Sequence, residues 1–340
     1  MSTILGKYID EFGNGRSLGP HDAELFLDAM IRETDESILS ELFNRWNAKD
    51  ITEDEIFSIA KIMRERCIRV RPSYAAFVDI VGTGGSKAKT FNVSTAAAFV
   101  AAGAGLPVAK HGNKAATSNS GSADVLSALG IEPAVNSATA ERCLNEIGIC
   151  FMFAPNFHRL SPTLAKVRRG LGFPTIFNCI GPLCNPAGAP HQLIGVWDKD
   201  LVPKMANALA RLGTKKSWVV HGEDGLDEIS LRAATIVAEV ENGAVRTFQV
   251  SPRDFGIDMG SPTEFQVRGA DESAKIIRGV LNGEMKETAA ENLVSLNAMA
   301  ALYIAGHSKG IREASGPVLD SIRNGHALKK LNALAEAVKE

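Results

Sequence analysis

A regular alternation of strand-like and helical runs beyond residue 73 restricts the fold more than any other feature of the chain. Short strand-like runs occupy 76–81, 106–110, 149–153, 174–177, 193–197 and 217–220. Helical runs at 95–102, 122–129 and 138–147 lie between several of them. This alternation predicts a mostly parallel central sheet with helices on both faces, in which ligands bind at the carboxyl ends of strands.

The first 70 or so residues lack such short strands. Apolar residues recur there at the spacing of amphipathic helices. Thr52 and Glu55 have the spacing of a capping box, which predicts the start of a further helix. The helical pattern ends near Pro72. We therefore expect an α/β protein with a small helical domain over 1–72 and a large α/β domain over 73–340.

Composition predicts a folded protein and excludes several classes. The 340 residues are 45% hydrophobic, with a formal net charge of −2 and a pI near 6.4. Without an overall basic field, nucleic acid is not expected as the main partner. The five cysteines have no Cys-x-x-Cys spacing, which favours reduced thiols in a cytoplasmic protein over a zinc site or disulfides.

No membrane span is expected either. The N-terminus lacks the basic-then-apolar pattern of a signal peptide. Two long stretches without Asp, Glu, Lys or Arg, at 90–109 and 170–197, are broken by Gly, Pro, Asn or Ser. Lipid-exposed spans accommodate such residues poorly, so both stretches are expected in the buried interior.

A glycine-rich turn follows the first predicted strand. The sequence Asp-Ile-Val-Gly-Thr-Gly-Gly at 79–85 precedes Thr90, Ser94 and Thr95, whose hydroxyls would lie near a helix N-terminus. Bare backbone amides and the helix dipole favour a phosphate there. The alternative is a plain strand-to-helix connection with ordinary N-cap residues. The turn matches neither a Walker loop nor Gly-x-Gly-x-x-Gly.

Two more polar loops follow predicted strands. The loop at 110–122 combines Lys110, Lys114 and several hydroxyls with glycines, which fits a second phosphate-binding loop or simply a polar loop before a helix. The loop at 221–228 ends in Asp227 and Glu228. Adjacent carboxylates suit Mg²⁺ beside phosphates, provided that Gly225 keeps them in a loop, and solvated turn acids are the alternative.

Taken together, the motifs resemble those of anthranilate phosphoribosyltransferases. The resemblance covers nearly the whole chain and rests on motifs in this order: 79–85, 90–95, 110–113, 121–124, 175–187 and 221–228. It implies a fold shared with pyrimidine nucleoside phosphorylases and a homodimer formed through the helical part. It also implies Mg²⁺-dependent transfer of a phosphoribosyl group from 5-phosphoribosyl pyrophosphate (PRPP) to anthranilate in tryptophan biosynthesis, without a catalytic nucleophile.

The resemblance further implies which residues bind the substrates. For PRPP these are Gly82, Gly85, Ser86, Thr90, Asn92, Ser94, Thr95, Lys110, Asn113, Ser118 and Ser122. For anthranilate they are Gly82, Asn113, His158 and Arg168, although a His and an Arg on a helix are more often surface residues. Two Mg²⁺ ions per subunit would bind, one on Ser94 and Glu228 and the other on Asp227 and Glu228.

Two segments depart from the family pattern. Ser86 and Lys87 stand where the family usually has Asp-Gly, and Arg-Leu-Ser-Pro at 159–162 replaces a segment that tends to read Pro-Ala-Met-Lys. These differences leave another aromatic acceptor as an alternative substrate. Nucleoside phosphorolysis and a non-catalytic nucleic-acid-binding relative are further alternatives, the latter disfavoured by the near-neutral charge.

Overall fold

A seven-stranded sheet organises the computed structural model, which describes residues 3–85, 90–115, 120–260 and 266–339. Its strands are β1 (Val78–Gly82), β2 (Val108–Gly112), β3 (Ile149–Phe153), β4 (His191–Gly195), β5 (Lys216–Gly222), β6 (Thr235–Glu241) and β7 (Ala244–Val250). They lie in the order β3-β2-β1-β4-β5-β6-β7. The first five are parallel and the last two antiparallel, which confirms the predicted mostly parallel sheet.

The order of the strands reverses at β1. The chain runs from β1 outward to β2 and β3 and then returns to place β4 on the other side of β1. In open α/β sheets, a crevice forms at the carboxyl ends of the strands beside such a switch point. The fold therefore provides a binding crevice next to Gly82, where β1 ends.

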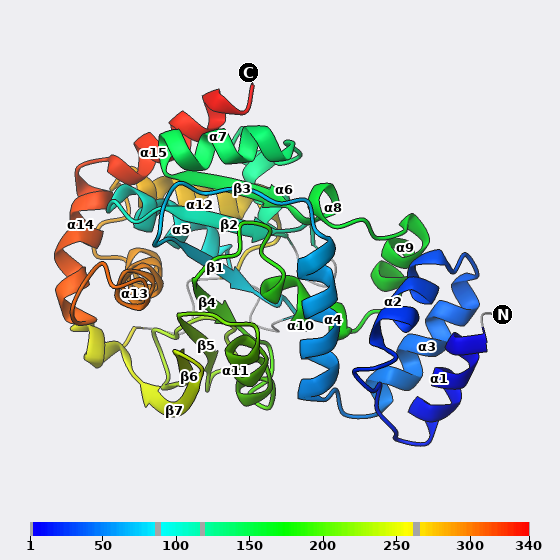
Figure 1. Cartoon of the computed structure of the whole chain (residues 1–340). Coiled ribbons are helices and arrows are strands. Elements are labelled where there is room, and N and C mark those ends of the chain that lie inside the picture. Colours follow the sequence, from blue (N-terminus) through cyan, green and yellow to red (C-terminus); the bar gives the residue numbers. More distant parts are fainter. Residues whose placement is uncertain (1–2, 86–89, 116–119, 261–265, 340) are drawn as a thin grey trace.

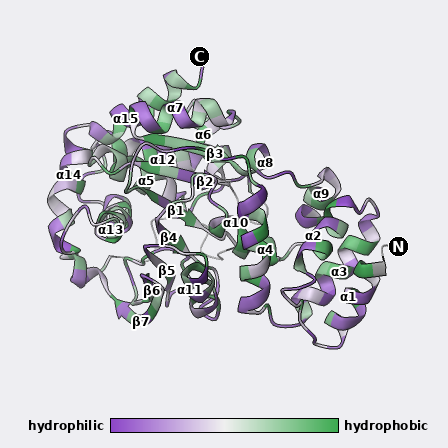
Figure 2. Cartoon of the chain, viewed as in Figure 1, coloured by the Kyte–Doolittle hydropathy of each residue, from purple (hydrophilic) through white to green (hydrophobic). Residues whose placement is uncertain are grey.

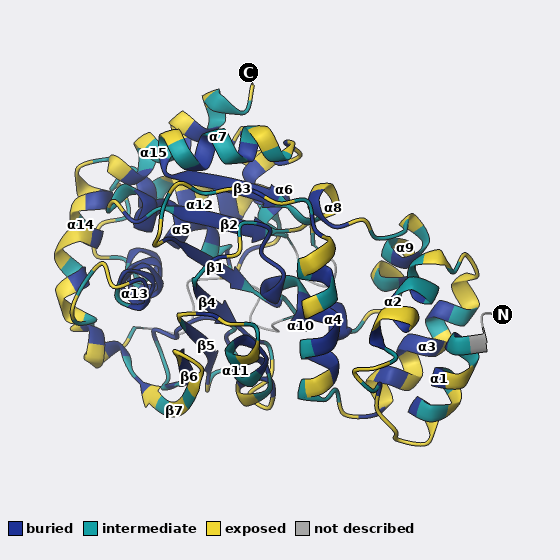
Figure 3. Cartoon of the chain, in the orientation of Figure 1, coloured by how far each residue is buried: buried dark blue, intermediate teal, exposed yellow. Residues whose placement is uncertain are grey.

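One face of the sheet is covered by a layer of helices that hold most of the core. Val78 and Ile80 of β1 point into this layer, whereas Val81, the next residue, joins the core on the opposite face. The layer contains α5 (Val93–Gly103), α6 (Ser122–Ala128), α7 (Ser137–Ile147), α12 (Ala270–Leu281), α13 (Ala289–Ile304), α14 (Ser315–Arg323) and α15 (His326–Ala337). Figure 3 shows α13 and the central strands as buried.

The other face is covered by α4 (Glu53–Arg66), α10 (Ile176–Leu183) and α11 (Leu201–Arg211). Beyond α4, and away from the sheet in Figure 1, lie α1 (Thr3–Gly13), α2 (Ala23–Arg32) and α3 (Glu36–Ala48). The short α8 (Ala154–Phe157) leads to α9 (Pro162–Gly170), which packs against α3. Two 3-10 turns, η1 (Pro252–Phe255) and η2 (Arg312–Ala314), complete the described elements.

The predicted strand at 174–177 is wrong, because α10 begins at Ile176. The Asn178 side-chain oxygen accepts the backbone N–H of Thr175 at 3.0 Å, which stabilises a helix start. A short apolar run does not by itself distinguish a strand from a buried helix. The local hydrogen bond therefore decides the structure of this segment.

Outer helices such as α1, α4 and α15 carry both hydrophilic and hydrophobic residues in Figure 2, as expected for helices with one buried face. Within the described residues, none of the helices combines the length and apolar character needed to span a bilayer.

A buried ion pair joins two helices of the N-terminal part. Glu55 and Lys49 side chains are 0% and 5% exposed, and their charged atoms lie 2.7 Å apart. Glu55 also accepts backbone N–H groups of Leu18 and Thr52, each at 2.9 Å. The capping box predicted for Thr52 and Glu55 is confirmed.

We expect Glu55→Gln to lower the free energy of unfolding by about 3 kcal/mol, because it leaves the buried Lys49 ammonium without a counter-charge. Urea denaturation measures this loss. Glu41→Gln is the matched control, since its partner Arg45 and Glu41 itself are about half exposed. That change should cost less than about 1 kcal/mol. Equal losses in the two variants would contradict a special role for the buried pair.

Candidate active site

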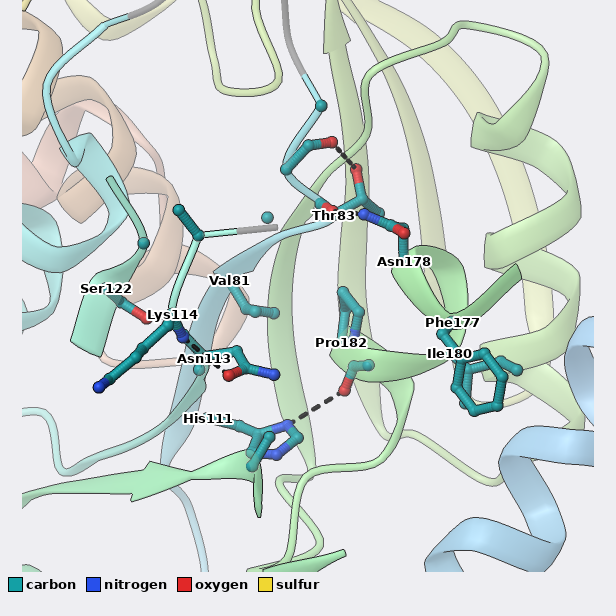
Figure 4. Close-up of a pocket in the computed structure, with 18 of the residues that line it drawn as sticks. Val81, Thr83, His111, Asn113, Lys114, Ser122, Phe177, Asn178, Ile180 and Pro182 are labelled. Carbon is teal, nitrogen blue, oxygen red and sulfur yellow. Dashed lines mark hydrogen bonds between the residues drawn. The ribbon is translucent and has the colours of Figure 1, made fainter. Parts of the chain in front are cut away.

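A cavity of about 630 Å³ opens at the carboxyl ends of β1 and β2, beside the switch point. It brings together residues from the glycine turn, the start of α5, the loop after β2, the acidic loop and helices α4, α9 and α10. Figure 4 shows part of its wall, with His111 and Pro182 on one side and Thr83 and Asn178 on another. The predicted residues that line it are Gly82, Gly85, Thr90, Asn92, Ser94, Lys110, Asn113, Ser122, His158, Arg168, Asp227 and Glu228.

The glycine turn is held from two sides. Gly84 and Gly85 have φ values of +64° and +86°, which L side chains rarely adopt. Thr83 N–H donates to Gly195 O at 2.9 Å on the β4 side. On the α10 side, Asn178 Nδ2 donates to Thr83 O at 3.1 Å. The turn is therefore anchored to both β4 and α10.

A buried lysine provides the positive charge at this end of the cavity. Lys110 is 4% exposed, and its ammonium donates to Ile80 O and, at 3.3 Å, to Ser94 Oγ. Burial lowers the pKa of Lys110, and the nearby carboxylates of Asp79 and Glu228 oppose that shift. The site thus holds an ammonium directly beside the N-terminal turn of α5, where the helix dipole also favours an anion.

The acidic pair faces the same point. Glu228 is 8% exposed, and its Oε1 accepts the N–H of Ser94 at 3.1 Å. Gly225, at φ +83°, lies in the turn before the pair, which stands in a loop as expected. Burial and the neighbouring charge of Asp227 raise the pKa of Glu228. A bound divalent cation would favour the ionised carboxylate, so the pair fits Mg²⁺.

Close packing at β4 requires a glycine beneath Asp227. A Cβ added to Gly195 would lie 1.6 Å from the backbone oxygen of Asp227. The acidic loop therefore lies directly on the backbone of β4. Any side chain at position 195 would displace Asp227 from the cavity.

Two histidines form the middle of the wall. His111 Nδ1 donates to Gly181 O at 3.1 Å, which leaves Nε2 unprotonated and, within the described residues, without a partner. The His158 ring lies edge-on at 5.1 Å from that of His111, and neither of its nitrogens has a partner with hydrogen-bond geometry in the described part of the chain. Burial lowers the pKa of His111 to about 3 and that of His158 to about 4. Both imidazoles are neutral at pH 7.

Arg168 marks the far end of the cavity. Its guanidinium carbon lies 4.7 Å above the Phe177 ring, and its Nε is buried without a partner among the described residues. Burial lowers the pKa of Arg168 to about 10, so the side chain remains cationic at pH 7. The surrounding wall is largely apolar and includes Met63, Leu160 and Ile180. An unpaired guanidinium beside an aromatic face suits a planar carboxylate.

Among the predicted PRPP residues that the structure describes, Thr95 is the one that does not line the cavity. Ser86 and Ser118, together with Lys87, lie outside the described residues. Thr95 is 0% exposed on α5 and is not among the lining residues. Its contact with PRPP stays a prediction.

The sequence did not predict several residues that line the cavity, among them Thr83, Phe177 and Asn178. The last two lie in the motif at 175–187, which carried the resemblance but was expected to begin with a strand. The Thr-x-x-Asn spacing at 175–178 was the available signal for a helix that faces the cavity.

Comparison with known proteins agrees with this geometry. The model of the family described as "Glycosyl transferase family, a/b domain" matches residues 74–328. The anthranilate phosphoribosyltransferase of Anaeromyxobacter dehalogenans is 46% identical over 289 residues, which is 85% of each chain. The chain belongs to the anthranilate phosphoribosyltransferase family. The Acidovorax sp. member is 43% identical over 317 residues, 92% of each chain.

Solved structures of the family share the fold. The Thermus thermophilus anthranilate phosphoribosyltransferase has a TM-score of 0.87 at 33% identity and covers 98% of this chain and 99% of its own. The Saccharomyces cerevisiae enzyme in complex with PRPP and Mg has a TM-score of 0.88 at 29% identity, with 100% and 99% covered. The same yeast enzyme has been solved with 4-fluoroanthranilate, at a TM-score of 0.87 and 27% identity, over 100% and 99% of the chains.

The neutral histidines predict a pH-dependent stability. Their pKa values of about 3 and 4 lie below the value of about 6.5 in an unfolded chain. Between pH 6.5 and 4 the unfolded state therefore binds more protons than the folded state. The free energy of unfolding should fall as the pH is lowered through this window, by up to about 1.4 kcal/mol per pH unit for each histidine.

Urea denaturation of the parent and of His158→Gln at pH 7, 6 and 5 measures this contribution. The variant should lose stability less steeply, because it removes one of the two groups. His326→Gln, at an exposed position on α15, is the control and should follow the parent. Parallel curves for parent and His158→Gln would show that His158 is not buried as a neutral group.

Proposed function

We propose that the enzyme transfers the phosphoribosyl group of PRPP to anthranilate, with Mg²⁺, to give N-(5-phosphoribosyl)anthranilate and pyrophosphate in tryptophan biosynthesis. The observation that carries the proposal is one cavity with two chemically distinct ends. Lys110, Ser94 and the acidic pair lie at one end, and Arg168 lies over an aromatic ring at the other. The yeast relative solved with PRPP and Mg supports this assignment.

The donor would lie across the end formed by β1, β2 and α5. Phosphate oxygens need directional donors and positive charge, which the start of α5, the Ser94 and Ser122 hydroxyls and Lys110 supply. The glycine turn lets the substrate approach the backbone closely between Gly82 and Gly85. We include Ser86, Thr90, Asn92, Thr95, Asn113 and Ser118 in the proposed PRPP site, as the family resemblance implies.

Ser94, Asp227 and Glu228 would hold two Mg²⁺ ions, in line with the preference of this ion for a few carboxylates plus substrate phosphates. The ions would neutralise charge on the departing pyrophosphate. Lys110 adds a fixed positive charge on the same side and needs no proton transfer to do so. The number of two ions is part of the proposal.

Anthranilate would bind between Gly82, Asn113, His158 and Arg168. The Arg168 guanidinium can donate two parallel hydrogen bonds to a carboxylate, since its Nε donates to none of the described residues. The neutral His158 and His111 add no competing charge at pH 7. The 4-fluoroanthranilate complex of the yeast relative supports an aromatic acceptor. The segment at 159–162 lines this end, so another aromatic acid is the second candidate acceptor.

In the proposed mechanism, the enzyme accelerates the reaction mainly by holding the two substrates in position. An aromatic amine is unprotonated at pH 7, so its nitrogen would form a bond to C1 of the ribose as the bond from C1 to pyrophosphate breaks. The proton that the nitrogen loses would pass to pyrophosphate or water, and no protein nucleophile is needed. Holding both substrates in one cavity supplies an effective molarity worth about 7–11 kcal/mol of the barrier. The apolar wall around Phe177 and Ile180 excludes water that would otherwise compete with the amine.

A homodimer in the cytoplasm, formed through the helical part, completes the proposal. The boundary between the helical domain and the α/β domain, placed near residue 72, belongs to it as well. Size-exclusion chromatography with light scattering tests the dimer, which should elute at twice the chain mass of 36.2 kDa.

The activity is tested by mixing the protein with PRPP, Mg²⁺ and anthranilate and following the loss of anthranilate fluorescence. Fluorescence should fall only when all three are present. Glu228→Gln should lower the rate roughly 100-fold, since it removes charge opposite the proposed metals. Glu223→Gln is the control, because Glu223 is an exposed residue of the same loop outside the cavity wall. No turnover by the parent would refute the activity, whereas full turnover by Glu228→Gln at limiting Mg²⁺ would refute only the metal site.

Arg168→Ala should raise the Michaelis constant for anthranilate roughly tenfold or more, because a charge-assisted hydrogen bond is lost. Calorimetric PRPP affinity should be unchanged. Lys166→Ala is the control, as this exposed lysine on the same helix pairs with Glu36 at 2.5 Å. Anthranilamide, which lacks the carboxylate, should be a poor substrate of the parent and little affected by Arg168→Ala. An equal loss for both acceptors would place Arg168 away from the carboxylate.

A further inference from the structure

A serine on a distant helix contacts the start of α5 directly. Ser273 of α12 is 0% exposed and lies 181 residues along the chain from Asn92. Its Oγ accepts the backbone N–H of Asn92 at 2.9 Å and donates to Asn92 Oδ1 at 2.9 Å. Both hydrogen-bonding capacities of one buried hydroxyl are thus directed at a single residue that lines the cavity.

The side chain of Asn92 is fixed further by Ser120. Ser120 Oγ donates to Asn92 Oδ1 at 2.8 Å, and Asn92 Nδ2 donates to the carbonyl oxygen of Ser120 at 3.3 Å. A carbonyl oxygen can only accept, so the amide nitrogen must face it. Oδ1 then receives both hydroxyl donors, and the second Nδ2 hydrogen, which no described residue accepts, remains for a ligand in the cavity.

This arrangement overrides the usual behaviour of an asparagine before a helix. Asn at an N-cap normally turns its side-chain oxygen toward the first free N–H groups of the helix. Asn92 precedes α5 and makes no such cap. A capping Oδ1 would compete with Glu228 for the N–H of Ser94, which Glu228 accepts at 3.1 Å. The Ser273 and Ser120 hydroxyls therefore keep Asn92 directed away from the helix start.

A second contact reinforces the link between the two segments. Thr90 forms an antiparallel bridge with Gln266, and Val267 beside it is 4% exposed. The chain at 266–273 therefore meets the loop before α5 at both Thr90 and Asn92.

We propose that Ser273 is a positioning residue for PRPP: it holds Asn92 so that its amide points toward the phosphate-binding end of the cavity. The proposal rests on PRPP binding as assigned above. Ser273 does not line the cavity and would act only through Asn92.

The test compares Ser273→Ala with the parent, in the presence of Mg²⁺, by PRPP calorimetry and steady-state kinetics. PRPP affinity should fall roughly tenfold, since two hydrogen bonds are lost, with a parallel rise in its Michaelis constant. The turnover number and the anthranilate Michaelis constant should change by less than about twofold. Ser295→Ala is the control, because this serine on α13 is 3% exposed and its Oγ has no partner among the described residues.

A double-mutant cycle separates positioning from a general structural effect. In an Asn92→Ala background, Ser273→Ala should weaken PRPP binding much less, because its partner side chain is gone. An equal loss of PRPP affinity in both backgrounds would overturn the proposal. An unchanged affinity of Ser273→Ala for PRPP, or an equally large loss of affinity for anthranilate, would overturn it as well. If Ser273→Ala does not fold, Ser273→Cys, which fills the space with a slightly larger side chain and a weaker donor, takes its place in the same comparison.

PRPP binding by the parent protein distinguishes failure of the proposed function from failure of the proposed role of Ser273. If the parent does not bind PRPP, both the proposed function and the role of Ser273 are refuted. If it binds PRPP and Ser273→Ala binds equally well, only the role of Ser273 is refuted.

Discussion

The cavity depends on how the buried side chains of Lys110 and Glu228 are held at Ser94, one by its hydroxyl and the other by its backbone N–H. Lys110 and Glu228 are both nearly inaccessible, and both contact Ser94. Buried polar and charged groups are costly unless they are hydrogen-bonded, so β2, the start of α5 and the acidic loop must meet within hydrogen-bond distance. The parallel order of the strands brings their carboxyl ends together, and Gly195 gives the acidic loop the space to lie against β4.

The two ends of the cavity differ in how fully their polar groups are satisfied. At the end beside α5, Asn92, Ser94 and Lys110 already have protein partners that fix their orientation. At the other end, the buried Nε of Arg168 has none within the described residues, and the His158 nitrogens make no hydrogen bond of good geometry there. Buried polar atoms without partners are rare in folded proteins and call for a ligand or water. The polar groups at one end are thus already oriented by hydrogen bonds within the protein, whereas those at the other end are available to a bound ligand.

How much the sequence could predict depended on whether the signal was local. The turn at Gly82, the helix that follows it and the loop placement of Asp227 were readable, because glycine, strand and helix patterns lie within a few residues. The helix at Ile176 was misread because its apolar run is short and its deciding bond involves the Asn178 side chain. Ser273 gave no sequence signal, since a single serine on an amphipathic helix is unremarkable until the fold brings it to Asn92.

The separation between interacting residues also bears on how the cavity forms during folding. Ser94 meets Glu228 across 134 positions, and Asn92 meets Ser273 across 181. Contacts between distant segments form only after the intervening loops close, which costs entropy and slows folding. During synthesis from the N-terminus, the glycine turn and Lys110 emerge well before Glu228 and Ser273. The end of the cavity beside α5 is therefore among the later parts of the molecule to be completed, and a nascent chain lacking α12 has not finished it.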